Sequence, residues 1–375
     1  ICVMSTMIDQ YSKHGLLLEA KETFFELPVR DIIAWTSLIS GYAEHGLGEE
    51  ALTYWDQMLV DGMAGNGVAY VCLLKACAVA TTPLRGQNSH SEICKKGLET
   101  DPSVCINLID MYVKCGCLEE AQNVFDCLQN RDVVAWNTLI TGYVEHGLLK
   151  EAFFCFEQMK MMGISLNAVT YLCLLRTCND VNKITWGRDI HTDIAKGGFE
   201  GDSAIGNALV SMYAKCGMLV EALEVFDKLA EQTTVSWTTI IAGYIKLGFH
   251  EKALGCLEQM QLQGILIDDV TFLCGLRACG NTNAFYDGLA IHAQIVEEGF
   301  DGHSPVCDTL VDMYARCGLF IEALDVFSEL KFRSNTSWTA LIVGYVEHGV
   351  HEEALKCFDQ MRQEDILPND ITYLY

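Results

Sequence analysis

Cysteine and histidine are the residues of this chain that could hold a metal. The 375 residues include 18 Cys and 10 His. Two segments, His90-Ser91-Glu92 and His351-Glu352-Glu353, have the H-x-E spacing in which a zinc deaminase uses histidine as a ligand and glutamate for proton transfer. Such a site also needs two cysteines in a P-C-x-x-C segment, and the sequence contains no C-x-x-C. We therefore expect no metal, no cofactor and no deaminase site within the chain.

Other catalytic signatures are absent as well. The sequence has neither the phosphate-binding loop G-x-x-x-x-G-K-[ST] nor the nucleophile elbow G-x-S-x-G. Its cysteines recur in pairs five residues apart, as in Cys72 with Cys77, at a spacing that follows the helical pattern. These features predict reduced, packed thiols and a protein without enzyme activity or a small-molecule substrate.

An internal repeat dominates the sequence. Tryptophan recurs every 101 positions, within IIAWTSLISGYAEHG, VVAWNTLITGYVEHG, TVSWTTIIAGYIKLG and NTSWTALIVGYVEHG, at Trp35, Trp136, Trp237 and Trp338. A second text recurs as INLIDMYVKCG, NALVSMYAKCG and DTLVDMYARCG, and a third as YVCLLKAC, YLCLLRTC and FLCGLRAC. Each period thus divides into units of about 35, 35 and 31 residues, which indicates a repeat protein.

Each unit has the pattern of a helical hairpin. Trp136, Leu139, Ile140 and Tyr143 form one apolar stripe, and Gly147 stands where a glycine ends a helix. A second stripe follows and ends at Gly163. Because two short helices cannot bury both their faces alone, consecutive pairs must stack. The predicted fold is all-α, a right-handed superhelix of stacked hairpins. No apolar run reaches the roughly 18 residues of a membrane span, so we expect no membrane association.

The period leaves tetratricopeptide and pentatricopeptide repeats open, and the residues favour the second. WNTLITGYVEHGLLKEAFFCFEQMKMMGI followed by NALVSMYAKCGMLVEALEVFDKL resembles plant pentatricopeptide repeat proteins, in the subclass that alternates standard, long and short motifs. The resemblance covers the whole chain as one repeat array. It divides the array into a short motif at 1–31, triplets at 32–132, 133–233 and 234–334, a standard motif at 335–369 and the start of a long motif at 370–375.

The resemblance implies single-stranded RNA as the ligand, with one motif for each base. In this family the fifth and the last residue of a motif together read the Watson–Crick edge. The implied pairs are Ser5 with Asp31 for guanine, Thr36 with Asn66 for adenine, Asn137 with Asn167 for a pyrimidine with cytosine favoured, Thr238 with Asp268 for guanine, and Thr339 with Asn369 for adenine. The implied target is 5′-GANN(C/U)NNGNNA-3′.

Six of the eleven motifs depart from the family pattern. Long motifs have apolar fifth residues that cannot bond a base edge: Val71, Leu172 and Leu273. Short motifs have the nonstandard pairs Ile106 with Asp132, Asn207 with Thr233, and Asp308 with Ser334. We expect these six positions to be read weakly or not at all.

The resemblance also assigns residues that flank the bases and the phosphates. Second residues of motifs flank each base, and they are Ile33, Val68, Val134, Val169, Val235 and Val270; the alternative is that they are ordinary core residues. Basic residues before the CG of short motifs are the expected phosphate contacts: Lys114, Lys215 and Arg316.

The formal net charge of −25 opposes capture of a phosphate backbone. Acid-rich segments such as GLGEEALTYWDQM belong to second helices, which favours an acidic outer face away from RNA. The leading hypothesis is RNA recognition in a mitochondrion or chloroplast, as the recognition part of an editing or processing factor. Its other partners would be editing-complex proteins or a downstream deaminase domain. The alternative is a solenoid that binds a basic protein.

Overall fold

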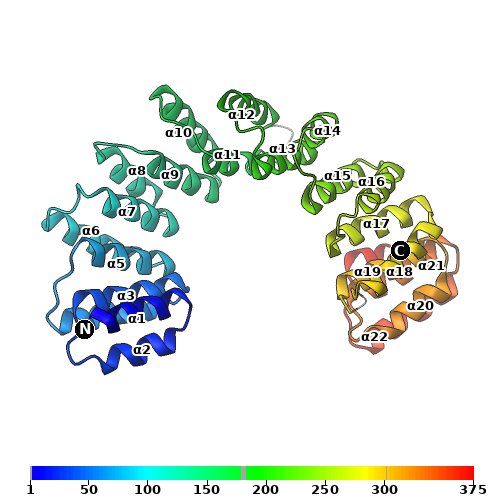
Figure 1. The fold of residues 1–375 in the computed structure, drawn as a ribbon. Helices are drawn as coiled ribbons and strands as arrows, with labels where there is room; N and C mark the ends of the chain where they lie inside the picture. Colours follow the sequence, from blue (N-terminus) through cyan, green and yellow to red (C-terminus); the bar gives the residue numbers. More distant parts are fainter. Residues whose placement is uncertain (1, 179–182, 301) are drawn as a thin grey trace. The chain divides into compact units, whose positions relative to one another are not determined.

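A computed structural model describes residues 2–178, 183–300 and 302–375, and all the regular elements in these ranges are helices (Figure 1). The chain divides into two compact units, residues 1–177 and 178–375. The expectation of an all-α fold built from helical hairpins is confirmed.

The first unit contains eleven described helices. They are α1 (Cys2–Lys13), α2 (Leu17–Glu26), α3 (Ile32–Glu44), α4 (Gly48–Val60), α5 (Gly67–Val79), α6 (Pro83–Lys95), α7 (Pro102–Lys114), α8 (Leu118–Cys127), α9 (Val133–Glu145), α10 (Leu149–Met161) and α11 (Ala168–Leu175).

The second unit contains twelve described helices. They are α12 (Ile184–Gly197), α13 (Ser203–Lys215), α14 (Leu219–Asp227), α15 (Thr234–Lys246), α16 (His250–Leu262), α17 (Asp269–Thr282), α18 (Phe285–Glu297), α19 (Ser304–Arg316), α20 (Phe320–Glu329), α21 (Asn335–Glu347), α22 (His351–Gln363) and α23 (Asp370–Leu374).

The odd-numbered helices are the first helices of the hairpins, and they stack on one another within each unit. Helix α3 packs against α1 and α5, and α19 packs against α17 and α21. The sharp turn inside each hairpin needs glycine: Gly147 follows α9 with φ 75°, and the N–H of Leu148 donates to the carbonyl of Tyr143. Glycine adopts this left-handed conformation without steric cost, so α9 ends where the sequence predicts.

Buried aromatic pairs join each short motif to the standard motif after it. Trp35 meets Phe24 edge to face with ring centroids 4.6 Å apart, and Trp136 meets Phe125 with the same separation. Equivalent contacts join Phe226 to Trp237 and Phe327 to Trp338. The repeated tryptophan is therefore a core residue of the stacked fold.

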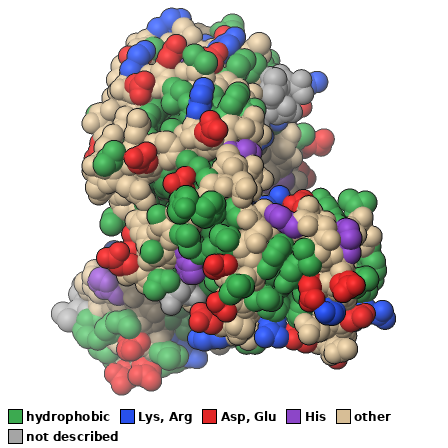
Figure 2. Space-filling model, turned by 90° about the vertical axis from the view of Figure 1, so that its right-hand side faces the viewer, with side chains coloured by type: hydrophobic (Ala, Val, Ile, Leu, Met, Phe, Trp, Pro, Cys, Tyr) green, Lys and Arg blue, Asp and Glu red, His purple; other side chains and the backbone are tan. Residues whose placement is uncertain are grey.

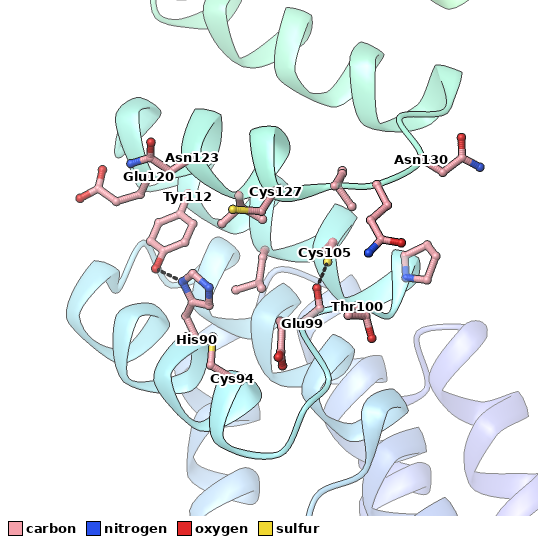
Figure 3. Close-up of a pocket in the computed structure, with 15 residues that line it drawn as sticks. His90, Cys94, Glu99, Thr100, Cys105, Tyr112, Glu120, Asn123, Cys127 and Asn130 are labelled. Atoms are coloured by element: carbon pink, nitrogen blue, oxygen red, sulfur yellow. Dashed lines mark hydrogen bonds between the residues drawn. The ribbon is translucent and has the colours of Figure 1, made fainter.

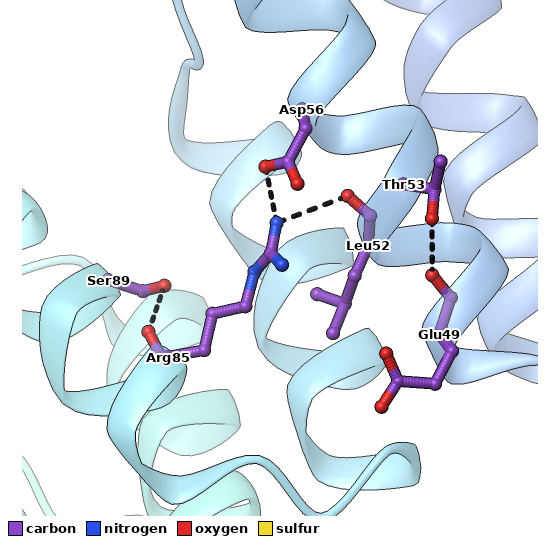
Figure 4. Close-up of polar contacts among 6 residues, drawn as sticks. All are labelled: Glu49, Leu52, Thr53, Asp56, Arg85 and Ser89. Atoms are coloured by element: carbon purple, nitrogen blue, oxygen red, sulfur yellow. Dashed lines mark hydrogen bonds and ion pairs between the residues drawn. The ribbon is translucent and has the colours of Figure 1, made fainter.

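Second helices contact each other through polar side chains. The Arg85 guanidinium on α6 forms an ion pair with Asp56 on α4 and donates to the carbonyl of Leu52 at 3.2 Å (Figure 4). In the second unit Arg188 on α12 pairs with Glu221 on α14 at 2.9 Å. These basic groups are thus engaged with acids on the second helices.

Acidic residues are concentrated on the second helices. These helices carry about three times as many Asp and Glu residues as the first helices, and α13 and α15 carry none. On the face shown in Figure 2, acidic side chains are intermixed with basic and apolar ones. The net charge of −25 is therefore carried mainly by helices other than those that hold the predicted reading residues.

Most of the described cysteines are buried or half-buried, and those from Cys72 to Cys357 are free thiols. Burial raises the pKa of Cys155 and that of Cys279 to about 12, so these thiols stay protonated and unreactive near neutral pH. Across the described ranges, no helix combines the length and the apolar character needed to cross a membrane.

Candidate functional site

The predicted reading residues lie on or directly before the first helices. The fifth residues of the four standard motifs are buried and only 7–9% exposed: Thr36, Asn137, Thr238 and Thr339. Ser5 on α1 is also buried. Each lies one turn into its helix, where a short polar side chain exposes only its tip.

The last residue of each standard motif caps the helix that follows it. Oδ1 of Asn66 accepts a hydrogen bond from the N–H of Ala69 at 2.9 Å, and Oδ1 of Asp268 accepts one from the N–H of Thr271 at 2.8 Å. The same contact is made by Asp31, Asn167 and Asn369. Because Asn and Asp are strong N-caps, helix capping alone accounts for a short polar residue at these positions. The capping bond uses one polar atom of each side chain and does not involve the second.

The structure brings five predicted residues together around one cavity in the second unit. The cavity has a volume of about 370 Å³ and is lined by residues of α13, α15 and the start of α17. Its lining includes Thr238, Asp268, Val235, Val270 and Lys215. Two predicted base readers, two flanking aliphatic residues and a cation thus share a space of the size typical of small-ligand sites.

In the first unit, the pair Asn137 and Asn167 is joined directly. Nδ2 of Asn137 donates to Oδ1 of Asn167 at 3.0 Å. The hydroxyl of Thr170 on α11 donates to Oδ1 of Asn137 at 2.6 Å and lies 3.0 Å from Oδ1 of Asn167. These contacts fix both amides in one orientation.

The last pair is joined through a threonine. Oγ1 of Thr339 lies 2.8 Å from Oγ1 of Thr372, which donates to Oδ1 of Asn369 at 2.9 Å. Like Thr339, Thr36 bonds the backbone of its own helix, at 2.9 and 3.0 Å to the carbonyls of Ile32 and Ile33, but Ala69 stands where Thr372 does in the last pair. Threonines at the third position of α11, α17 and α23 are absent from the sequence-based predictions.

The predicted flanking residues are exposed rather than buried. Their exposed fractions range from 49% for Val270 to 63% for Val68, and the other four members, Ile33, Val134, Val169 and Val235, lie between these values. An ordinary core residue would be nearly inaccessible, so the alternative assignment of these side chains to the core is wrong. Ile371 occupies the same position on α23 and is 54% exposed. Within each unit, these aliphatic side chains are therefore about half or more exposed to solvent.

The three predicted phosphate contacts differ in their surroundings. Lys114 pairs with Asp110 at 2.9 Å, and Arg316 pairs with Asp312 at 3.0 Å. Lys215 has Ser211 one turn earlier, and it lines the cavity near Thr238 together with Lys246, whose Nζ donates to the carbonyl of Lys215. The cavity beside Thr238 therefore has two cations, whereas Lys114 and Arg316 are each neutralised by a neighbouring acid.

The short-motif residue Asp308 occupies a fifth position and is also buried. Oγ of Ser334, the cap of α21, donates to its Oδ2 at 2.8 Å. Burial raises the pKa of Asp308 above its usual range. The nonstandard pair Asp308 with Ser334 is thus in contact within the second unit.

A second cavity of about 570 Å³ lies among α6, α7 and α8 in the first unit (Figure 3). On its wall Nδ1 of His90 bonds the hydroxyl of Tyr112 at 2.9 Å. The same pair recurs as His191 with Tyr213 and His292 with Tyr314, so it is a structural feature of the repeat. Cys94, Cys105 and Cys127 also line this cavity, but no predicted site residue does. Within the described residues, no three His, Cys, Asp or Glu side chains are placed to bind a metal ion.

Comparison with known proteins identifies the repeat. Residues 30–79, 131–180, 232–281 and 333–374 match the PPR repeat family, and residues 2–32, 104–133, 207–232 and 306–334 match the PPR repeat. The structure of the pentatricopeptide repeat protein PPR10 from maize covers 99% of this chain and 60% of that protein's chain, with a TM-score of 0.60 and 18% identity. This likeness shows a shared α-solenoid fold.

Relatives in Arabidopsis thaliana match along the whole chain. Pentatricopeptide repeat-containing protein At4g18520, chloroplastic, is 32% identical over 373 residues, which cover 100% of this chain and 60% of the relative. Pentatricopeptide repeat-containing protein At2g03380, mitochondrial, is also 32% identical over 373 residues and is covered to 54%. The chain thus spans somewhat more than half the length of these two relatives. Together with the family match, these similarities show that the chain belongs to the pentatricopeptide repeat family.

Proposed function

We propose that this chain binds single-stranded RNA and reads selected bases, one for each motif. The observation that carries the proposal is the cavity beside Thr238 and Asp268. The exposed Val235 and Val270 line the same cavity, and Lys215 and Lys246 supply positive charge. Aliphatic side chains can cover both faces of any base, hydrogen-bonding groups can read its edge, and cations can hold its phosphates.

The proposal extends to the five pairs and to the order of bases. The chain would read 5′-GANN(C/U)NNGNNA-3′, with the first motif at the 5′ end. The half-buried side chains of Val71, Leu172 and Leu273 support weak reading by long motifs, because they offer no hydrogen bond to a base. The alternation of units of about 35, 35 and 31 residues supports the subclass with standard, long and short motifs.

The biological setting is also part of the proposal. Relatives named chloroplastic or mitochondrial support an organelle as the location. We propose that the chain recognises a transcript for editing or processing and that catalysis, where it occurs, comes from a downstream deaminase domain or an editing-complex protein. The chain itself would contribute binding and no chemical step.

The test is fluorescence anisotropy with two labelled RNAs of 11 bases at low salt. One RNA matches the target, and the other has all five informative bases exchanged. We expect the matched RNA to bind more tightly, and raising the salt concentration should weaken both complexes. Equal or absent binding of both RNAs would contradict the proposal.

The net charge of −25 favours a second candidate, a solenoid that binds a basic protein. Because acids are concentrated on second helices, a basic protein would bind a surface other than that of the reading residues. Absent RNA binding, together with salt-sensitive binding of a lysine-rich polypeptide, would support the second candidate.

A further inference from the structure

Three buried threonines contact both members of a proposed reading pair. Thr170, Thr271 and Thr372 occupy the third position of α11, α17 and α23, and their exposed fractions are 0%, 0% and 4%. Each hydroxyl lies within hydrogen-bonding distance of the fifth residue of one motif and of the last residue of the same motif. Each threonine therefore belongs to one motif and contacts the reading pair of the motif before it.

We propose that these threonines are positioning residues that set the base preference of the pair they join. The inference rests on the proposed function, because it concerns the same RNA-binding sites. A hydroxyl has one proton to donate and lone pairs that accept. Where that proton goes determines which atoms of the pair remain to donate to a base and which remain to accept from it.

The pair Thr238 and Asp268, proposed to read guanine, shows most clearly how the threonine proton decides which atoms face the base. An ionised Asp268 can only accept, so the hydroxyl of Thr271 donates its single proton to Oδ1 of Asp268. Towards Thr238, Thr271 can then act only as an acceptor, and Oγ1 of Thr238 also lies 2.7 Å from the carbonyl oxygen of Thr234. Either way, the proton of Thr238 points to protein. Thr238 and Asp268 are left as two acceptors, and guanine is the base whose Watson–Crick edge presents two adjacent donors, N1–H and N2–H.

The pair Asn137 and Asn167, proposed to read a pyrimidine, presents hydrogen-bond donors in place of acceptors. Oδ1 of Asn137 accepts from Thr170, and Oδ1 of Asn167 accepts from Nδ2 of Asn137 and from the N–H of Thr170. The remaining groups are N–H donors of the two amides. Cytosine presents two adjacent acceptors, N3 and O2, whereas the N3–H of uracil is a donor. The contacts of Thr170 therefore favour cytosine over uracil.

The pair Thr339 and Asn369, proposed to read adenine, presents one donor and one acceptor. Oδ1 of Asn369 accepts from the hydroxyl and the N–H of Thr372, which leaves its Nδ2 as a donor. The hydroxyl of Thr339 is close to the carbonyl of Asn335 at 2.8 Å and keeps its lone pair as an acceptor. One donor beside one acceptor complements N1 and the N6 amino group of adenine.

The first two reading pairs have no such hydroxyl. Alanine occupies the equivalent third position, as Ala34 on α3 and Ala69 on α5. In the described part of the chain, the hydroxyl of Thr36 bonds only backbone carbonyls of its own helix and is not coupled to Asn66 through a third residue. We expect base discrimination at these two positions to be weaker than at the positions served by threonine.

Thr271→Val tests the inference, because valine keeps the shape and removes the hydroxyl. The readout is the ratio of affinities for two 11-base RNAs that differ only in guanine or adenine at the eighth base. Because the lost hydrogen bond is to the carboxylate of Asp268, we expect this ratio to fall about tenfold or more. Thr271→Ser should restore it. Thr192→Val is the control, since Thr192 is an exposed threonine on α12 whose hydroxyl donates to the carbonyl of Arg188, outside the cavity lining.

The outcomes separate the inference from the proposed function. An unchanged ratio in Thr271→Val, or no recovery in Thr271→Ser, would overturn the inference while the parent chain still prefers the matched RNA. Weaker binding to both RNAs with the same ratio would show a purely structural role and would also overturn it. No preference of the parent chain at any informative base would overturn the proposed function and this inference together. Unaltered preferences at the fifth and eleventh bases would show that the variant is folded.

Discussion

Replacing Asp268 by asparagine should change the preferred eighth base from guanine to adenine. Oδ1 of Asp268 accepts from the N–H and the hydroxyl of Thr271, and asparagine keeps this oxygen. Because Asn and Asp are equally good N-caps, the free energy of unfolding should change by less than about 0.5 kcal/mol. The second oxygen becomes an NH₂ group, which donates to N1 of adenine and opposes N1–H of guanine.

The size of the effect follows from the hydrogen bond that the substitution removes. A hydrogen bond to a charged group contributes about 1.5–3 kcal/mol, so the affinity for guanine should fall roughly 10- to 100-fold relative to that for adenine. The assay is fluorescence anisotropy with four 11-base RNAs that differ only at the eighth base. Asp269→Asn is the control, because it removes the same charge at the next residue. An unchanged order of the four bases in Asp268→Asn would refute the assignment of Asp268.

Three further predictions concern other residues. Replacing Asn137 by threonine should move the preference at the fifth base from a pyrimidine towards adenine, and unaltered relative affinities there would show that the pair is not read. Replacing Lys215 and Lys246 together by glutamine should weaken binding to matched and exchanged RNAs alike. It should also reduce the slope of log affinity against log salt by about 0.7 for each phosphate that is no longer bound. Lys356→Gln on α22 is the control, and equal weakening by this substitution would argue against a specific role of Lys215 and Lys246. Burial lowers the pKa of His90, His191 and His292, which bond tyrosines, from the ordinary value of 6.5. The unfolded chain therefore binds protons more readily than the folded chain. The contribution of these histidines to stability is present above pH 6.5 and is lost as the pH falls below that value. Thermal unfolding between about pH 7 and pH 5 should show a falling midpoint, and a rising midpoint would contradict the sign.

The sequence predicts the helical hairpins because their spacing is a local property. An apolar stripe that begins at Trp136 and a glycine at position 147 are sufficient to place α9 and its end. The capping role of Asn66 could have been recognised from an asparagine directly before an apolar helix. The bridging role of Thr271 could not, because it depends on a contact with Thr238, 33 residues earlier, which only the stacking of α15 and α17 creates.

The surroundings of the basic residues can likewise be predicted only in part from the sequence. Lys114 and Lys215 occupy equivalent positions in the repeat, and the difference between them comes from the residue one turn earlier, Asp110 or Ser211. That difference is visible in the sequence once the helix is assigned. The cavity that Lys215 and Lys246 share is not visible there, because it is formed by neighbouring hairpins.

Selection from a pool of random single-stranded RNAs tests the central claim most directly, because it presupposes no target. The bound RNAs would be sequenced and compared with the starting pool. The proposed reading predicts enrichment of guanine, adenine, a pyrimidine, guanine and adenine at positions 1, 2, 5, 8 and 11 of a common window, with the sharpest preferences at positions 5, 8 and 11. A bound pool with the base composition of the starting pool, or an enriched sequence without this spacing, would contradict it.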